Sequence, residues 1–383
     1  MSSKKKICWI VASPLTIKFF LMDQIFTLSK KYDLTVITNT SDLHFLGKQV
    51  RVISLRIERK ISLYRDIIAF FRLLIILNKE KFNLIHTLSP KSGLLGMLAA
   101  WLSSTPIRIH VFQGEVWASR KGLFRIFLKT LDRCIVYFAT NLLAVSRSEA
   151  EFLLKEGIVT KKSIKVLANG SICGVDLNRF IQNKIVRSKV RRQYNIKEND
   201  RIILYVGRLT QDKGILDLTR AFLRLAIQNS NIHLLIVGPD EEDIKKKIED
   251  LCVNIRNNVH FSGYTNNPEH YMAASDILCL PSYREGFGLV LIEAAAVGIP
   301  TVGSRIYGII DAIQDGITGL LFCKGDIKDL TKKISTILKN EKLAKSLGNA
   351  GRQRVRRDFD CKLILNDLLK FYENIFKKKY LRI

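Results

Sequence analysis

Closely spaced cysteines are missing from this chain of 383 residues. The seven cysteines stand far apart, at positions 8, 134, 173, 252, 279, 323 and 361. Such spacing indicates neither a disulfide framework nor a zinc knuckle. We therefore expect reduced thiols and a cytoplasmic protein.

A long uninterrupted apolar run is also missing. The longest candidate, ISLYRDIIAFFRLLIILNKEKF, contains Arg65, Asp66 and Arg72, so no segment qualifies as a membrane-spanning helix. The apolar run after Lys4 to Lys6 is too short for a signal peptide and lacks a cleavage pattern. We expect it to be the first strand of a sheet. The turn after it lacks the Gly-x-Gly-x-x-Gly pattern, which argues against a dinucleotide-dependent oxidoreductase.

Acidic side chains are scarce, with 35 Asp and Glu against 62 Lys and Arg and a formal net charge of +27. Residues 1–178 hold 27 basic and 12 acidic residues, a net of +15, and the remainder holds 35 and 23, a net of +12. A chain that is basic in both halves favours an anionic partner. Charge alone would fit a nucleic-acid-binding protein, but no recognised binding motif and no interleaved aromatic and basic stripe accompanies it. We therefore expect no nucleic-acid partner.

One segment concentrates basic charge on a predicted helix. In SRKGLFRIFLKTLDRCIVYFA the basic residues recur every four positions, and the apolar residues spread over the other faces. A basic amphipathic helix of this kind suits an anionic membrane surface. A helix packed on its own sheet with a solvated charged edge is an equal alternative. The four residues of this basic stripe are Lys121, Arg125, Lys129 and Arg133.

Segments typical of strands and helices alternate along the chain in two series. The first contains KICWIVAS, LTVIT, NLIHTLS, IRIHVF and LLAVS, with helices such as GLLGMLAAWL between them. After a polar, basic and weakly structured stretch near residues 178–200, the second contains RIILYVG, IHLLIVG, NVHFSG, DILCLP and PTVGS. The pattern predicts an α/β fold of two doubly wound parallel-sheet domains, covering residues 1–178 and 195–361. Ligands of such sheets bind outside the carboxyl ends of the strands, so we expect the working site in a cleft between the domains.

The stretch PSYREGFGLVLIEAAAVGIP, residues 281–300, ends one of these strands. It predicts a glycine loop and then a helix that begins near Phe287 and ends at Gly298. Because the first-turn amides of a helix lack internal partners, the loop would bind a phosphate or diphosphate. Glu285 and Glu293 would bracket that anion, which suits a nucleotide diphosphate sugar with hydroxyls on both sides. A solvated loop glutamate and a solvated helix glutamate are an equal alternative for this stretch alone.

A second signal opens the second domain, where LYVGRLTQDKG follows a strand. Arg208 and Lys213 would project from this loop at the same strand-end edge as the glutamate pair. Two cations beside a helix N-terminus suit a diphosphate of about two to three negative charges. Isolated residues of this type are usually surface cations, but their position in a neighbouring parallel unit favours a binding site.

Four motifs agree in order and spacing: GRLTQDKG, VHFSGY, SYREGFGLVLIEAAAVGIP and DGITGLLF. Together they resemble the donor half of the family 4 retaining glycosyltransferases, which have the GT-B fold of two Rossmann-like domains facing a central cleft. KSGLLGMLAAWL, IRIHVFQGEVW and NGSICGVDLNRF resemble the branch that builds capsule, O-antigen and other lipid-linked bacterial glycans. The resemblance covers nearly the whole chain and is strongest over residues 201–323. We also expect a C-terminal helix near residues 362–383 to join the first domain.

The resemblance implies a role for each motif residue. Arg208 and Lys213 would hold the donor diphosphate, and Glu293 would hold the ribose hydroxyls. Glu285 would face the transferred sugar and its phosphate. The other implied donor-binding residues are Gly263 and Tyr264 near the base, and Gly286, Phe287, Gly288 and Leu289 near the sugar.

Two departures from the family pattern concern the first domain. Many members have a double glycine after the first strand, where this chain has Ala12-Ser13-Pro14-Leu15. Many also have a His-Gly pair whose histidine reaches the donor sugar, where this chain has Gln113-Gly114. We expect Gln113 to make this contact, with His110 as the alternative, although His110 is equally compatible with a packed strand side chain. Glu115 could polarise an acceptor hydroxyl, but a surface loop carboxylate is the simpler interpretation.

These residues define an expected reaction. A hexose or N-acetylhexosamine would move from a nucleotide diphosphate sugar, with UDP favoured, to a lipid-linked (polyprenyl diphosphate) glycan in bacterial surface polysaccharide synthesis. The resemblance implies retention of the anomeric configuration, with the leaving phosphate accepting the acceptor proton. Arg208, Lys213 and the helix amides would stabilise the leaving group, so neither a metal nor another cofactor is expected. Glu285 and Gln113 complete the expected catalytic set.

The expected location follows from the acceptor and the charge. We expect a peripheral protein on the cytoplasmic face of the cell membrane, bound to anionic lipid through the basic stripe. The main alternative is a GT-B sugar-nucleotide epimerase, which would share the donor pocket but need acid and base groups on both faces of the sugar. A basic nucleic-acid-binding protein is a further alternative.

Overall fold

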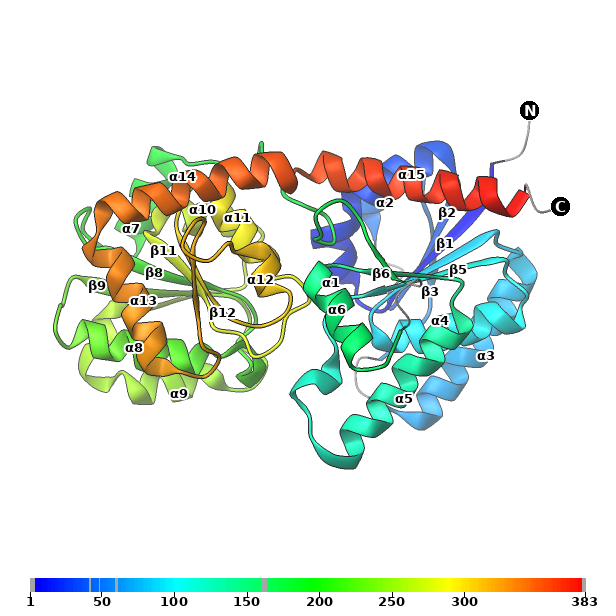
Figure 1. The fold of residues 1–383 in the computed structure, drawn as a ribbon, viewed down its shortest axis with the longest axis horizontal. Helices are drawn as coiled ribbons and strands as arrows, with labels where there is room; N and C mark the ends of the chain where they lie inside the picture. The colour runs from blue at the N-terminus through cyan, green and yellow to red at the C-terminus, as the bar shows by residue number, and fades with distance from the viewer. Residues whose placement is uncertain (1–3, 41–42, 48, 59–60, 160–163, 381–383) are drawn as a thin grey trace. The chain divides into compact units, whose positions relative to one another are not determined.

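The structure is a computed structural model that describes residues 4–40, 43–47, 49–58, 61–159 and 164–380. The chain divides into two compact units (Figure 1). The first unit comprises Met1–Cys173 together with Lys362–Ile383, and the second comprises Gly174–Cys361. The sequence places the end of the first domain at residue 178 and the start of the second at residue 195.

The first unit is built on a seven-stranded sheet in the order β3-β2-β1-β4-β5-β6-β7, and all neighbouring strands are parallel. This is the doubly wound arrangement, with the order reversing between β1 and β4. The strands are β1 (Lys6–Val11), β2 (Asp33–Thr38), β3 (Arg51–Ser54), β4 (Leu84–Leu88), β5 (Ile107–Phe112), β6 (Asn141–Ala144) and β7 (Ile164–Val166). The helices are α1 (Pro14–Thr16), α2 (Met22–Lys31), α3 (Leu63–Glu80), α4 (Pro90–Leu102), α5 (Gly122–Phe138), α6 (Arg147–Lys155) and α15 (Cys361–Tyr380), with short helical turns at Ile17–Leu21, His44–Leu46 and Val116–Ser119.

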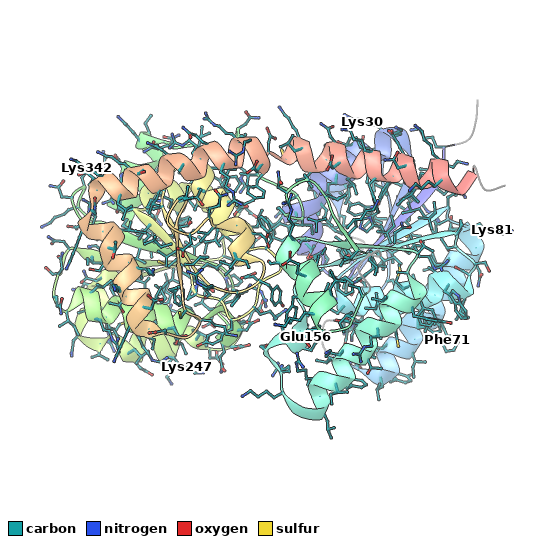
Figure 2. The ribbon with its side chains drawn as sticks, in the orientation of Figure 1. Lys30, Phe71, Lys81, Glu156, Lys247 and Lys342 are labelled. Carbon is teal, nitrogen blue, oxygen red and sulfur yellow. The ribbon has the colours of Figure 1, made fainter. Side chains whose placement is uncertain are left out.

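Helix α4 is buried because two glycines let it lie directly on the sheet. A Cβ on Gly93 would come within 2.4 Å of the His110 ring, and one on Gly96 within 2.6 Å of Thr87. Helices α3 and α5 pack on either side of α4 along the same face of the sheet (Figures 1 and 2). Beyond α5, Arg125 and Lys129 donate to Glu156 at the end of α6, whereas the outer side of α3 carries exposed side chains.

The C-terminal helix α15 completes the core of the first unit. The Tyr372 hydroxyl accepts a hydrogen bond from the Trp9 indole N–H at 3.0 Å and lies 2.5 Å from Nδ1 of His86. All three side chains are buried. Tyr32 adds an edge-on ring contact to Tyr372 at 6.1 Å. The helix therefore belongs to the first unit, although it follows the second unit in sequence.

The second unit has a six-stranded sheet in the order β10-β9-β8-β11-β12-β13, again entirely parallel. The order reverses between β8 and β11. The strands are β8 (Arg201–Val206), β9 (Ile232–Val237), β10 (Val259–Gly263), β11 (Ile277–Leu280), β12 (Thr301–Ser304) and β13 (Leu320–Phe322). The helices are α7 (Lys184–Gln193), α8 (Ile215–Ala226), α9 (Ile244–Leu251), α10 (Pro268–Ala274), α11 (Leu289–Val297), α12 (Ile309–Ala312), α13 (Ile327–Lys339) and α14 (Glu341–Asp358), with helical turns at Gln211–Lys213 and Val253–Asn258.

The predicted α/β fold of two doubly wound parallel sheets is confirmed, and each strand named from the sequence is present. Three short edge strands, β3, β7 and β13, were not among the predicted strands. The expectation of a weakly structured stretch near residues 178–200 is wrong, because α7 forms there. Ion pairs hold this polar helix: Arg191, which is buried, donates to Asp276 at 2.8 Å, and Arg187 donates to the same carboxylate at 3.2 Å.

Candidate functional site

The loops that follow β8 and β11 meet at the carboxyl edge of the second sheet. These strands are neighbours, and the chain leaves them toward opposite sides of the sheet, which makes this edge the topological switch point. The backbone N–H of Tyr283 donates to the carbonyl of Asp212 at 2.9 Å, and Arg284 donates to the Asp212 carboxylate at 2.9 Å. Hydrogen bonds therefore join the two predicted phosphate-binding loops into one surface.

Gly214 permits the closest approach between the loops. A Cβ at this position would lie 2.0 Å from the carbonyl oxygen of Pro281, and its φ of 67° is a conformation that other residues rarely adopt. Gly308, after β12, makes a similar approach to the backbone of Glu285 and Gly286. Three successive loops thus converge at the switch point.

We expect Gly214→Ala to lower the free energy of unfolding by about 2 kcal/mol or more, because the added carbon combines backbone strain with an overlap that moves the loops apart. Denaturant unfolding of the variant measures this change. Gly316→Ala is the matched control: its φ is 76°, but no atom lies within 4 Å of the added carbon, so only about 1 kcal/mol should be lost. Equal losses in the two variants would contradict the proposed approach of the loops.

Lys213 and Glu285 form an ion pair across these two loops. The ammonium lies 2.5 Å from Oε1 of Glu285, with 17% and 14% of the two side chains exposed. The Ser282 hydroxyl donates to the same carboxylate oxygen at 2.9 Å. Because an ammonium has three donors, Lys213 can retain this bond and still donate to a phosphate.

Arg208 lies in the loop after β8 and pairs with Glu241 at 2.7 Å, with 30% and 37% of the side chains exposed. A pair this exposed contributes little to stability. Arg208 can therefore leave Glu241 and bind an anionic ligand with little loss of free energy. The buried Tyr205 donates its hydroxyl to the carbonyl of Arg208 at 2.7 Å and so fixes the loop. The structure thus places both predicted cations at the predicted edge.

Glu293 lies in the first turns of α11, with a side chain that solvent reaches only in part. Burial raises the pKa of this carboxyl to about 7; the charge of Arg179 opposes that shift, and the charge of Glu269 adds to it. Arg179 is itself paired with Glu269 at 2.8 Å. Glu293 is therefore poised to change protonation near neutral pH, and a polar ligand that hydrogen-bonds its carboxylate would shift this balance.

The helix that follows the glycine loop begins later than the sequence predicts. α11 starts at Leu289, and Gly288 precedes it with a φ of 80°; the expected start near Phe287 is wrong because this left-handed residue is not part of the helix. The Phe287 side chain is buried against the Phe359 ring, with centroids 5.3 Å apart. Phe287 can therefore offer a ligand its backbone, whereas its ring belongs to the core.

The predicted base-binding residues follow β10. Gly263 has a φ of 69°, and its carbonyl accepts a hydrogen bond from the Gly238 N–H at 2.9 Å. Tyr264 is 48% exposed, and its hydroxyl donates to Asn266 at 3.0 Å. Both residues thus lie at the carboxyl edge that also holds Arg208.

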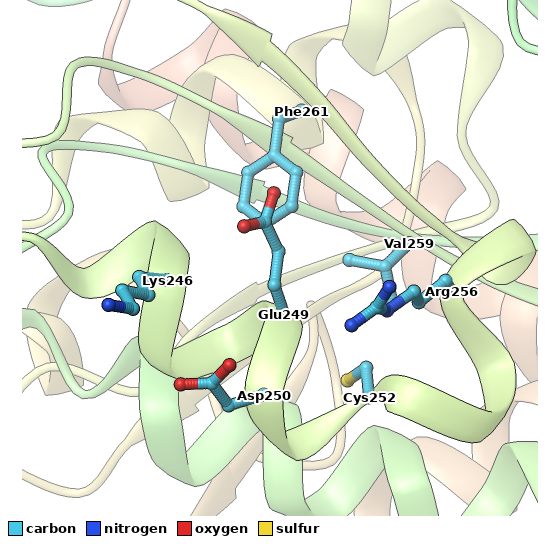
Figure 3. A pocket seen from close by; sticks show the side chains of 7 residues that line it. All are labelled: Lys246, Glu249, Asp250, Cys252, Arg256, Val259 and Phe261. Atoms are coloured by element: carbon cyan, nitrogen blue, oxygen red, sulfur yellow. The ribbon is translucent and has the colours of Figure 1, made fainter.

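A hollow lies elsewhere on the second unit. Its volume is about 590 Å³, and side chains from α9, the turn after it and β10 line it (Figure 3). The lining includes the carboxylates of Glu249 and Asp250, and its strand residues are Val259 and Phe261, the first and middle residues of β10. The two carboxylates argue against a diphosphate site here.

In the first unit, Gln113 and His110 differ in environment. His110 is buried on β5, its Nδ1 lies 2.8 Å from the Thr87 hydroxyl, and burial lowers its pKa to about 3. It is a packed neutral side chain. Gln113 follows β5, and its Nε2 is buried without a hydrogen-bond partner in the described part of the chain. Of the two residues, Gln113 has the donor available for a ligand.

The loop after Gln113 is held by buried carboxyl groups. Glu149 on α6 accepts hydrogen bonds from the N–H groups of Gly114 and Val145, and it is fully buried. The expectation that Glu115 is a surface carboxylate is wrong, since only 2% of it is exposed. Burial, reinforced by the nearby Glu115 carboxyl, raises the pKa of Glu149 well above its usual range. Glu149 was not identified from the sequence and positions the Gln113 loop.

The predicted basic stripe of α5 does not face solvent as a whole. Arg125 and Lys129 both donate to Glu156, at 2.7 and 2.8 Å, and Lys129 is only 13% exposed. Arg133 donates to the carbonyl of Gly157 at 3.2 Å. Three of the four cations are therefore bound where this edge of α5 packs on the end of α6, and contact of the stripe with anionic lipid stays a prediction. Only Lys121, at the start of the helix, is exposed without such a contact.

Comparison with known proteins finds two family models that match the chain. The family model described as "Glycosyl transferases group 1" matches residues 186–354, and that described as "Glycosyltransferase Family 4" matches residues 24–178. The chain is 29% identical over 323 residues to the capsular polysaccharide biosynthesis glycosyltransferase CapM of Staphylococcus aureus, covering 84% of each chain. It is 30% identical over 278 residues, 70% of each chain, to the Escherichia coli UDP-Gal:alpha-D-GlcNAc-diphosphoundecaprenol alpha-1,3-galactosyltransferase.

A solved structure shares the fold over nearly the whole length. The crystal structure of Anabaena HepE in complex with UDP and glucose has a TM-score of 0.81 at 20% identity, covering 97% of this chain and 100% of that one. The GT-B fold class expected from the motifs is thereby confirmed.

Proposed function

We propose, from the premise that the chain belongs to the glycosyltransferases of group 1, that it is a retaining enzyme using a UDP-sugar. It would move a hexose or N-acetylhexosamine to a polyprenyl diphosphate-linked glycan. The observation that supports this most directly is the convergence of Arg208, Lys213 and the start of α11 at one switch point, with Glu285 before that helix and Glu293 within it. This arrangement supplies cations, backbone amides and hydroxyl acceptors in the order that such a donor requires.

The proposed reaction depends on leaving-group stabilisation. The bond between the sugar C1 and the diphosphate oxygen breaks, and its electron pair remains on the phosphate. The acceptor hydroxyl oxygen bonds to C1 on the same face, and its proton passes to the departing phosphate. Lys213, Arg208 and the amides before α11 offset the charge that develops there, without the reorganisation that water would need.

Two further residues have proposed roles in orienting the donor. Glu293 accepts hydrogen bonds from the ribose hydroxyls. Because these bonds favour the carboxylate form, a bound donor lowers the pKa that burial raises. Gln113 donates its unpaired amide to the transferred sugar. Lys213 keeps Glu285 in place beside the sugar and phosphate.

The donor and acceptor classes are proposed from the relatives. The Escherichia coli relative is named for a UDP-sugar and a diphosphoundecaprenol acceptor, and HepE was solved with UDP and glucose. An acceptor of that class is anchored in a bilayer. We therefore propose a peripheral enzyme on the inner, anionic face of the cell membrane, with no nucleic-acid partner. No helix in the described ranges is both long and apolar enough to cross a bilayer.

Incubation with a panel of nucleotide sugars and polyprenyl diphosphate-linked acceptors tests the proposal. We expect one UDP-sugar to be consumed, with formation of a lengthened lipid-linked glycan. NMR coupling constants of the new linkage should show the same anomeric configuration as the donor. An epimerised nucleotide sugar without transfer would identify an epimerase instead, and an inverted linkage would overturn the retaining mechanism.

We expect the transfer rate to be unchanged by a chelator, because Lys213 and Arg208 supply the positive charge that a metal would otherwise provide. The rate is measured with EDTA and again with added magnesium or manganese. A rate that falls with EDTA and recovers with either metal would contradict the metal-independent mechanism.

A further inference from the structure

Helix α3 exposes an apolar stripe from Leu63 to Ile75. Leu63, Ile67, Phe71 and Ile75 recur every four residues and are 77%, 55%, 56% and 66% exposed. Tyr64, beside them, is 76% exposed. Residues four apart lie on one helix face, so these side chains form a continuous apolar surface. The opposite face of α3, with Ala69, Leu73 and Leu77, is buried in the core.

A basic rim borders this stripe. Arg65, Arg72 and Lys79 recur every seven residues, on the side of α3 next to the apolar stripe, and all three are exposed. Arg65 forms an ion pair with Glu58. The two carboxylates of the helix are neutralised by ion pairs: Asp66 by Lys91 at 2.8 Å, and Glu80 by Arg51 at 2.7 Å. The exposed side of α3 is thus apolar at its centre and positive at its edge.

Helix α5, on the other side of α4 from α3, also exposes apolar side chains (Figure 1). They do not form one stripe: Ile126 lies seven residues before Arg133, on the side that packs on α6, and the others lie on other sides of the helix. These residues are Leu123, Phe124, Ile126 and Phe127, which are 85%, 49%, 58% and 50% exposed.

We infer that the outer face of α3 inserts into the interface of an anionic lipid bilayer. A helix with aromatic and aliphatic residues on one face and cations beside them lies in the plane of the headgroups and buries its apolar side chains at the acyl boundary. The cations match the negative surface of such a bilayer. The membrane contact would then depend on apolar insertion by α3, and the paired cations of α5 would not make it. The inference rests on the proposed function in one respect, namely that the bilayer bound by α3 also holds the acceptor.

A bilayer fits this surface better than a second copy of the chain does. A formal net charge of +27 makes two copies repel each other, and a basic rim facing its own equivalent would add to that repulsion. An anionic lipid surface offers apolar depth and opposite charge together.

Vesicle co-sedimentation tests the inference, with phosphatidylcholine vesicles that contain or lack phosphatidylglycerol. The α3 variant combines Ile67→Gln, Phe71→Gln and Ile75→Gln. We expect its partition coefficient on the anionic vesicles to fall at least about tenfold, because the transfer of three apolar side chains is lost. The matched variant combines Ile185→Gln, Ile227→Gln and Val253→Gln, which are 82%, 76% and 53% exposed on the second unit. It should bind as the wild type does.

Depth of insertion provides an independent measurement. We expect the fluorescence of Phe71→Trp to shift to the blue on anionic vesicles and to be quenched by brominated acyl chains, beyond any change seen for the wild type. Added salt should weaken binding by screening the rim but leave a residual apolar component. Wild-type binding by the α3 variant, or no quenching of Phe71→Trp, would overturn the inference. So would a wild-type dimer that becomes a monomer in the α3 variant while vesicle binding is unchanged.

The vesicle assays need neither donor nor acceptor, so their outcome is separate from that of the proposed function. The α3 variant should also retain wild-type activity on a short-chain, water-soluble acceptor, which shows that it is folded. Insertion without transferase activity would reject the proposed function alone. Transfer with no effect of the α3 substitutions on vesicle binding would reject the inference alone.

Discussion

Replacing Lys213 with alanine should lower kcat about a hundredfold or more, because a preorganised cation is removed from the point where the leaving diphosphate gains charge. Lys213 is only 17% exposed and is fixed by Glu285 at 2.5 Å. Its removal also leaves the Glu285 carboxylate unpaired beside an anionic donor. Arg208→Ala should have an effect of the same order.

Single-turnover measurements separate this effect from slow product release. Lys345→Ala is the matched control, since Lys345 lies in the same unit and pairs with Glu341 at 2.6 Å but is 71% exposed. Its kcat should equal that of the wild type. A folded Lys213→Ala enzyme with unchanged kcat would show that the diphosphate is stabilised by other groups.

Glu293→Gln should have opposite effects on binding and on stability. Without the carboxylate, the ribose hydroxyls lose a charge-assisted hydrogen bond of about 1.5 to 3 kcal/mol, so the donor KM should rise about tenfold or more. In the wild type, donor affinity should increase as pH rises through about 7, the pKa of Glu293. The variant should show no such rise.

The stability effect follows from the direction of the pKa shift. The carboxyl has an ordinary pKa of 4.5 in the unfolded chain and about 7 in the folded one. Between these values the folded state binds the extra proton, so the free energy of unfolding falls as pH rises and the full penalty is present above pH 7. The neutral amide removes that penalty. We expect the variant to be more stable than the wild type by about 1 to 3 kcal/mol above this range.

Donor titrations at several pH values check the effect on donor binding. Thermal and denaturant unfolding over the same pH range check the effect on stability. Glu341→Gln is the control, because Glu341 is 66% exposed and should change neither measurement. A Glu293→Gln enzyme with normal donor affinity at every pH would remove Glu293 from the binding site.

A short run of apolar residues identifies a buried parallel strand from local sequence alone. The strands, and the edge of the sheet that holds the site, could therefore be predicted. Arg208, Lys213 and Glu285 all follow such strands, and strand ends of a parallel sheet share one edge. The pairing of Lys213 with Glu285 could not be predicted, since it requires β8 and β11 to be neighbours. Strand order is set by packing of the whole sheet and is not contained in any local pattern.

Contacts between distant polar residues were missed for the same reason. Arg179 and Glu269 pair across 90 positions of sequence, and no periodicity links them. The spacing of the α5 cations correctly placed them on one side of a helix, but it contained no information about the acidic end of α6 that covers that side. Glu156 is a single carboxylate in a segment without a motif. Helix periodicity identifies a face, whereas tertiary packing decides what covers it.

The hydrogen bond between Trp9 and Tyr372 joins residues 363 positions apart, and this has a consequence for synthesis on the ribosome. The first sheet emerges early, but its core lacks α15 until the second unit has been synthesised. The second unit, contained within Gly174–Cys361, has all its strands before then and can fold while the first remains open. Contacts of such long sequence separation form late. The nascent chain therefore exposes the Trp9 and His86 surface while the second unit is synthesised, and a truncation before Tyr372 should leave the first unit unable to close.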